Sequence, residues 1–102
     1  MWRMDVDREG DTAVVRVAGE LDSAGSRLLR ACLGGLLADG VRVLRVDVAG
    51  VSFVDAAGLG VLIGAARRMR EAGGELVVES PSRPVTRLLT LTGADAALGL
   101  AV

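Results

Sequence analysis

Three glycines near the middle of the chain could, by residue type, cradle a phosphate. Gly58, Gly60 and Gly64 open an expected helix after a strand, and Glu79 lies further along the chain. A dinucleotide-binding fold uses such glycines to bring backbone amides to a pyrophosphate, with an acidic residue about twenty positions on. Here the third glycine is one residue too far, and the chain lacks the second half of such a fold. We therefore expect small residues that let a helix approach a sheet, and no cofactor.

Two aspartates, Asp22 and Asp55, could be proposed as a pair for acid–base chemistry. Each stands where a helix is expected to begin, and aspartate at that position caps free backbone amides. The chain has no histidine that could activate a serine or the single Cys32. Cys32 lies on the apolar face of its helix, where a small core residue is expected. We expect no enzyme, no catalytic residue and no metal site.

Residues 51–58 are unusual for a plain connection between a strand and a helix. Apolar residues precede Asp55, and Ala56, Ala57 and Gly58 follow it. An exposed helix start with small side chains would let another protein approach its amides closely. An ordinary turn explains the same composition, so the residues alone leave both interpretations open.

The composition is typical of one small globular domain. Of 102 residues, 51% are hydrophobic and 25% are charged. Twelve basic and thirteen acidic residues nearly cancel, and no basic run suggests a nucleic-acid groove. No apolar leader is visible in residues 1–7, and the apolar stretch 56–66 is far shorter than the ~20 residues of a membrane span. We expect one cytoplasmic domain over residues 1–102 that does not insert into a membrane and binds no nucleic acid.

Hydrophobic periodicity predicts an α/β domain with the order β-β-α-β-α-β-α and a C-terminal tail. Strands are expected at residues 2–6, 12–18, 41–48 and 75–79. Helices are expected at residues 23–38, from Asp55 to a stop at Gly73 and Gly74, and from about Pro84 to Gly93. Residues 94–102 are apolar and ambiguous. Crossovers around the two long helices predict parallel strand pairs.

Two of these elements carry more detailed expectations. The strand at 41–48 has apolar residues at five positions, which predicts a central strand with most of both faces covered. The helix at 23–38 should present one apolar face, made of Leu28, Leu29, Cys32, Leu33, Leu36 and Leu37. Gly34 and Gly35 interrupt this helix, which predicts either close packing there or an early end.

Three segments, in order, resemble the STAS domain of the anti-sigma factor antagonists. Residues 18–33 read AGELDSAGSRLLRACL, similar to the family's G-E-L-D at the start of the first helix. Residues 46–64 read VDVAGVSFVDAAGLGVLIG, similar to D-x-S-G followed by D-S-S-G-L-G. Residues 81–93 read PSRPVTRLLTLTG, similar to the final helix with its L-x-x-T-G close. The resemblance covers nearly the whole chain and implies a single STAS-type domain, a mixed sheet with helices packed mainly on one face.

The resemblance also implies a phosphorylation switch that this sequence has lost. In the family, the second serine of D-S-S-G accepts phosphate from the partner anti-sigma factor, a Ser/Thr kinase of the histidine-kinase-like ATPase type. The unmodified antagonist binds that partner and frees the sigma factor, and the phosphorylated one lets go. Here Ala56 and Ala57 replace both serines, and Ala57 occupies the acceptor position without a hydroxyl. Ser52 is the nearest hydroxyl, but the motif does not support its use, and Gly25 stands where the family usually has threonine.

The expected function is therefore an anti-sigma factor antagonist that phosphorylation at position 57 cannot turn off. The expected contact residues gather at the two helix starts: Asp22, Ser23, Ser52, Asp55, Ala56, Ala57, Gly58 and Leu59. An alternative within the same family is a STAS scaffold subunit that binds the ATPase of an ABC-type lipid transport complex. The Ala56-Ala57 sequence is compatible with that role, because a scaffold needs no hydroxyl.

Overall fold

The computed structural model describes residues 1–98 and contains four strands and four helices in that part of the chain. The strands are β1 (Trp2–Glu9), β2 (Thr12–Leu21), β3 (Val43–Val54) and β4 (Glu75–Glu79). The helices are α1 (Ser23–Ala38), α2 (Ala56–Glu71), α3 (Arg83–Thr92) and α4 (Ala94–Ala97). The predicted order is confirmed, and the ambiguous tail begins with α4. Residues 99–102 of that tail lie outside the described residues.

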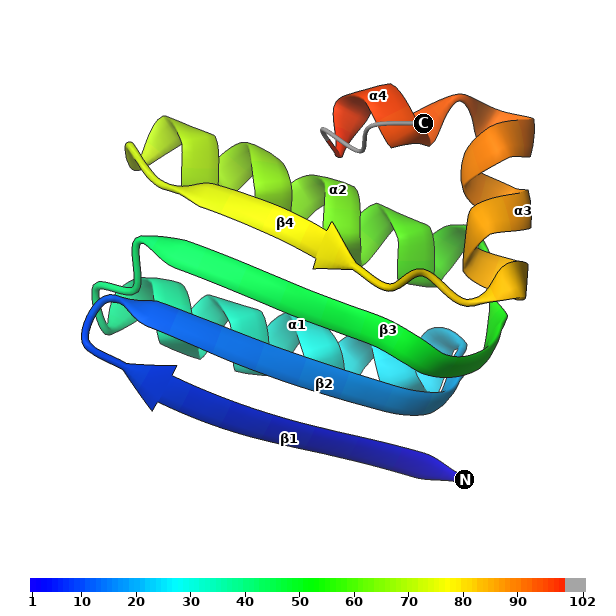
Figure 1. The fold of residues 1–102 in the computed structure, drawn as a ribbon, viewed down its shortest axis with the longest axis horizontal. Coiled ribbons are helices and arrows are strands. Elements are labelled where there is room, and N and C mark those ends of the chain that lie inside the picture. Colours follow the sequence, from blue (N-terminus) through cyan, green and yellow to red (C-terminus); the bar gives the residue numbers. More distant parts are fainter. Residues whose placement is uncertain (99–102) are drawn as a thin grey trace.

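The strands form one mixed sheet in the order β1-β2-β3-β4. β1 pairs antiparallel with β2, whereas the β2–β3 and β3–β4 pairs are parallel. In Figure 1, α1 and α2 lie together behind the sheet, and α3 stands beside the end at which β3 finishes. The predicted mixed sheet with helices mainly on one face is confirmed.

The two faces of β3 differ, contrary to the expectation that most of both would be covered. Leu44, Val46 and Val48 are buried on the helix side. Arg45, between them, is exposed, and its Nε donates a hydrogen bond to Glu79 Oε2 at 3.0 Å. The apolar residues thus alternate with polar ones along most of the strand, as they do when helices cover one face of a sheet only.

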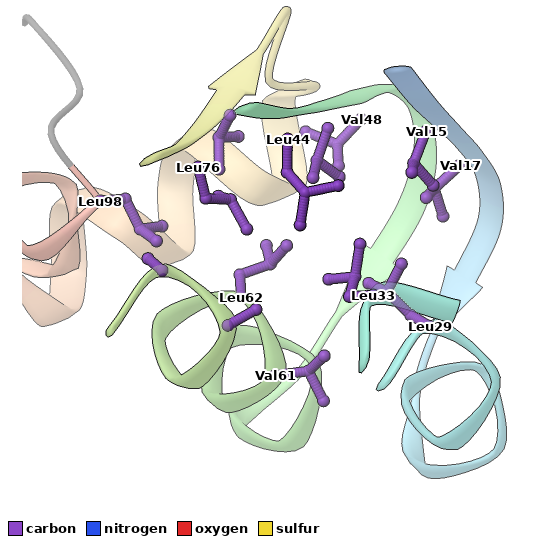
Figure 2. Close-up of a cluster of buried hydrophobic side chains, with 14 of the residues drawn as sticks. Val15, Val17, Leu29, Leu33, Leu44, Val48, Val61, Leu62, Leu76 and Leu98 are labelled. Atoms are coloured by element: carbon purple, nitrogen blue, oxygen red, sulfur yellow. The ribbon is translucent and has the colours of Figure 1, made fainter. Parts of the chain in front are cut away.

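An aliphatic core fills the space between the sheet and the two long helices (Figure 2). Leu29 and Leu33 of α1 and Leu62 of α2 are almost completely buried against residues such as Val15 and Leu44 of the sheet. Full burial of one such side chain contributes about 1.5–3 kcal/mol. This core fixes both helices on the sheet and thereby fixes where they begin.

Both β2 and β3 extend beyond the ends that the sequence predicted. β2 continues to Leu21 rather than ending at residue 18, and β3 continues to Val54 rather than ending at residue 48. The pairs Gly19–Val51 and Leu21–Val54 prolong the ladder, with register irregularities before them. Gly19 has φ = 106°, and a Cβ there would lie 1.8 Å from the Met1 carbonyl oxygen. Glycine usually marks a break in a strand. Here Gly19 lies inside β2 because the N-terminal backbone passes too close to leave room for a side chain.

The expectations for Gly34 and Gly35 are both wrong. α1 runs without interruption to Ala38, and a Cβ at either glycine would meet nothing within 4 Å. The structure offers no explanation for the two glycines.

Leu28, expected on the apolar face of α1, is 50% exposed. Leu29 and Leu33 define the buried line of the helix, and Leu28 projects about 100° away from it.

The helix stops predicted at Gly73 and Gly93 are confirmed. Gly73, just beyond α2, has φ = 82°, and Gly93, just beyond α3, has φ = 71°. Both lie in the left-handed region that glycine adopts without strain. Within residues 1–98, no helix has both the length and the apolar character needed to cross a membrane.

Candidate functional site

The two long helices begin side by side at one edge of the sheet. β2 and β3 are parallel, and their last residues, Leu21 and Val54, are paired. Asp22 and Asp55 follow these residues directly, so the strand register brings both helix starts together. The Asp55 N–H also donates to the Leu21 carbonyl at 3.5 Å, which links the two chain segments.

Both aspartates cap their helices. Gly25 N–H donates to Asp22 Oδ1 at 3.0 Å, and Gly58 N–H donates to Asp55 Oδ1 at 3.0 Å. The predicted capping role is confirmed for both residues. Each carboxylate satisfies an amide that has no partner within the helix, so capping accounts for both aspartates without catalysis.

The third residue of each helix is a glycine for a steric reason. A Cβ on Gly58 would lie 2.5 Å from the Leu21 carbonyl oxygen, and a Cβ on Gly25 would lie 2.5 Å from the Glu20 carbonyl oxygen. Both helices therefore rest directly on the end of β2. The expected close approach is right for Gly58, but Gly60 and Gly64 have nothing within 4 Å of a Cβ and play no part in it.

The expected contact residues divide into exposed and buried groups. Ser23, Ser52, Ala56 and Ala57 are exposed, and Asp22 and Asp55 are partly buried beneath them. Gly58 and Leu59, which the sequence placed on the contact surface, are both buried. Leu59 is 6% exposed and belongs to the core, so these two residues seat the helix and offer little surface to a partner.

Ser52 and Phe53 lie at the end of β3 beside the helix starts. The Ser52 hydroxyl donates to the Gly19 carbonyl at 3.3 Å, so it ties β3 to β2. Phe53, the single phenylalanine of the chain, is 45% exposed. The sequence does not identify Phe53 as a surface residue because it stands in an apolar run with Val51, which is buried, and Val54, which is half-buried.

We call the exposed residues Ser23, Ser52, Ala56 and Ala57 the helix-start surface. Its side chains are hydroxyls and methyl groups. Within residues 1–98, no group of three or more His, Cys, Asp or Glu residues is placed to hold a metal ion. Cys32 is partly buried against the core, as expected, and burial raises the pKa of its thiol. A raised pKa lowers the share of nucleophilic thiolate.

Comparison with known proteins gives the family. The profile described as "Mlab, STAS domain" matches residues 4–100. The chain is 34% identical over 90 residues to the anti-sigma-B factor antagonist of Bacillus subtilis (strain 168), covering 88% of this chain and 82% of that protein.

Solved structures agree with this match. An anti-sigma factor antagonist from Mycobacterium paratuberculosis superimposes with a TM-score of 0.81 at 27% identity, covering 98% of this chain and 85% of that chain. Bacillus SpoIIAA shares the fold at 22% identity in its unphosphorylated form (TM-score 0.82, covering 98% and 89%) and its phosphorylated form (0.76, covering 98% and 92%). The chain therefore belongs to the STAS domain family.

Proposed function

We propose that this protein is an anti-sigma factor antagonist, which binds an anti-sigma factor and thereby frees a sigma factor. The observation that carries the proposal is the 34% identity, over most of both chains, to a relative with that name. The exposed small residues at the paired helix starts supply a surface for such a contact. A partner in transcription control would meet the protein in the cytoplasm, and the function requires binding rather than catalysis.

The proposed contact surface is centred on the first turn of α2. Ala56 and Ala57 are exposed there, and Ser23 at the start of α1 and Ser52 near the end of β3 are exposed as well. Small side chains leave the first-turn amides of α2 open to close approach, and these amides form a partially positive helix end. Asp22, Asp55, Gly58 and Leu59 act beneath this surface by fixing the two helices in place.

We further propose that the contact is not switched by phosphorylation at position 57. By the family resemblance, the partner is a Ser/Thr kinase of the histidine-kinase-like ATPase type, and Ala57 stands at the acceptor position. A phosphate would add a charge of about −1.5 to −2 in the middle of the contact, which favours dissociation. Alanine accepts no phosphate, so the protein stays in its binding form.

The transport-scaffold alternative gains no support from the relatives described above. The proteins with an assigned role among them are named as antagonists of anti-sigma factors. The proposed partner is therefore an anti-sigma factor and not an ABC-transporter ATPase.

The proposal is tested by calorimetry with purified anti-sigma factors of the host, using the wild-type protein and Ala57→Glu. Glutamate places a charge in the proposed contact, so we expect Ala57→Glu to weaken binding at least about tenfold, or about 1.4 kcal/mol. Ala31→Glu, at an exposed position in the middle of α1, is the matched control and should bind like the wild type. Equal binding by both variants would show that the contact lies elsewhere on the protein. No binding by the wild type would contradict the proposed function.

A further inference from the structure

One side of α3 carries two arginines and a leucine in one line. Arg83, Arg87 and Leu91 are spaced by four residues, so they lie above one another on the same side of the helix. All three are exposed, and Leu91 is exposed to 77% of its surface. α3 stands beside the end of β3 (Figure 1), close to the helix-start surface.

A hollow of about 400 Å³ lies between this line and the end of β3. Phe53 and Val54 line it from β3, and Leu88 and Leu91 line it from α3. Phe53 and Leu91 are both large, exposed apolar side chains. Two apolar groups whose burial would be favourable therefore face one hollow. Ser52 also lines it, and Ser52 belongs to the proposed contact surface as well.

The charged residues that line this hollow are both arginines. Arg83 and Arg87 line it, and no carboxylate does. A second hollow on the other flank of α3 is lined by the same two arginines, again without a carboxylate. Elsewhere on the surface, Arg16 pairs with Asp7 and Arg45 pairs with Glu79. Among the ion pairs of residues 1–98, none involves Arg83 or Arg87.

We propose that this groove binds an acidic amphipathic segment of a protein partner. Apolar side chains of the segment fill the hollow against Phe53 and Leu91, and its carboxylates pair with Arg83 and Arg87. Guanidinium groups one helical turn apart match carboxylates repeated along a helix or an extended segment, and arginine pairs with carboxylate through two parallel hydrogen bonds. Through Ser52 the groove continues the helix-start surface, and on the proposed function the segment belongs to the anti-sigma factor.

The first test uses a probe that does not depend on the partner's identity. Helical peptides with leucine on one face and either glutamate or lysine on the other are titrated into ¹⁵N-labelled protein. The acidic peptide should shift the amides of Phe53, Arg87 and Leu91, and the lysine peptide should not. No shift at these residues, or equal shifts with both peptides, would overturn the proposal. Shifts with decanoate but not with the acidic peptide would also overturn it, because they would indicate a lipid site.

Charge reversal gives the second test. The double variant Arg83→Glu, Arg87→Glu should bind the acidic peptide about tenfold more weakly and should gain affinity for the lysine peptide. The control Arg67→Glu, Arg68→Glu makes the same charge change on exposed residues near the end of α2 and should alter binding less than about twofold, because screening weakens distant charges. Equal losses of affinity in both double variants would show that the effect depends only on net charge, and they would overturn the groove proposal.

The same variants separate this inference from the proposed function. An anti-sigma factor could lose binding to Ala57→Glu and still bind the variant with reversed charges at Arg83 and Arg87. That result would contradict the groove proposal and leave the proposed function standing. If no anti-sigma factor binds the wild type while the acidic peptide still binds at the groove, the proposed function fails and the groove stands.

Discussion

α1 and α2 begin with nearly the same residues, and both helix starts pack against the end of β2. Each begins with an aspartate cap, continues with two exposed small residues and then has a glycine pressed against the end of β2. The two starts differ at the first helical position, where α1 has the hydroxyl of Ser23 and α2 has the methyl group of Ala56. The cap and the glycine are dictated by packing, so the residues between them are free to vary with the contact that they make.

The largest effect should come from the glycine at each helix start. Gly58→Ala would place a Cβ 2.5 Å from a backbone oxygen of Leu21, which the helix avoids only by shifting. We expect a loss of about 2–3 kcal/mol of unfolding free energy, measured by urea denaturation. Gly25→Ala should cost a similar amount, because its Cβ would meet the Glu20 carbonyl at the same distance.

Gly60→Ala is the matched control for these two variants. Gly60 lies two residues after Gly58 in the same helix, but a Cβ on Gly60 would meet nothing within 4 Å. Alanine favours the helix over glycine by about 1 kcal/mol, so this variant should be at least as stable as the wild type. If Gly58→Ala proved equally harmless, the steric account of both helix starts would be wrong.

A smaller effect should come from the caps. Asp55→Ala and Asp22→Ala each remove a hydrogen bond to a first-turn amide and should cost about 1 kcal/mol. Asn caps helices about as well as Asp, so Asp55→Asn and Asp22→Asn should keep most of the stability. Thermal unfolding of the four variants measures the difference. A large loss of stability in the asparagine variants would show instead that the negative charge at the helix start, and not the hydrogen bond, supplies most of the cap's contribution.

Local signals in the sequence predict much of this architecture. The span of α1 and the span of β4 agree with the structure because local signals mark them: an aspartate cap precedes α1, and a short apolar run after Gly73 and Gly74 marks β4. The capping roles of Asp22 and Asp55 are local as well, since each involves an amide three residues away.

What the sequence could not predict depends on contacts between distant segments. The extensions of β2 and β3 arise from their pairing with each other, and the meeting of the two helix starts follows from the Leu21–Val54 register. The exposure of Phe53 depends on how the end of β3 packs. The groove beside α3 likewise exists only once α3 has docked next to β3. A periodic pattern identifies a buried face but not the neighbour that covers it.

The measurement that tests the central claim most directly is the effect of ATP on binding to a kinase-type anti-sigma factor. Wild-type protein and Ala57→Ser are each incubated with the partner and ATP, and their affinities and phosphate incorporation are compared with the values in ADP. We expect the wild type to bind equally well in both nucleotides without incorporating phosphate. Ala57→Ser should take up phosphate and lose affinity in ATP alone. ATP-dependent phosphorylation and release of the wild type would contradict the claim that this antagonist cannot be switched off.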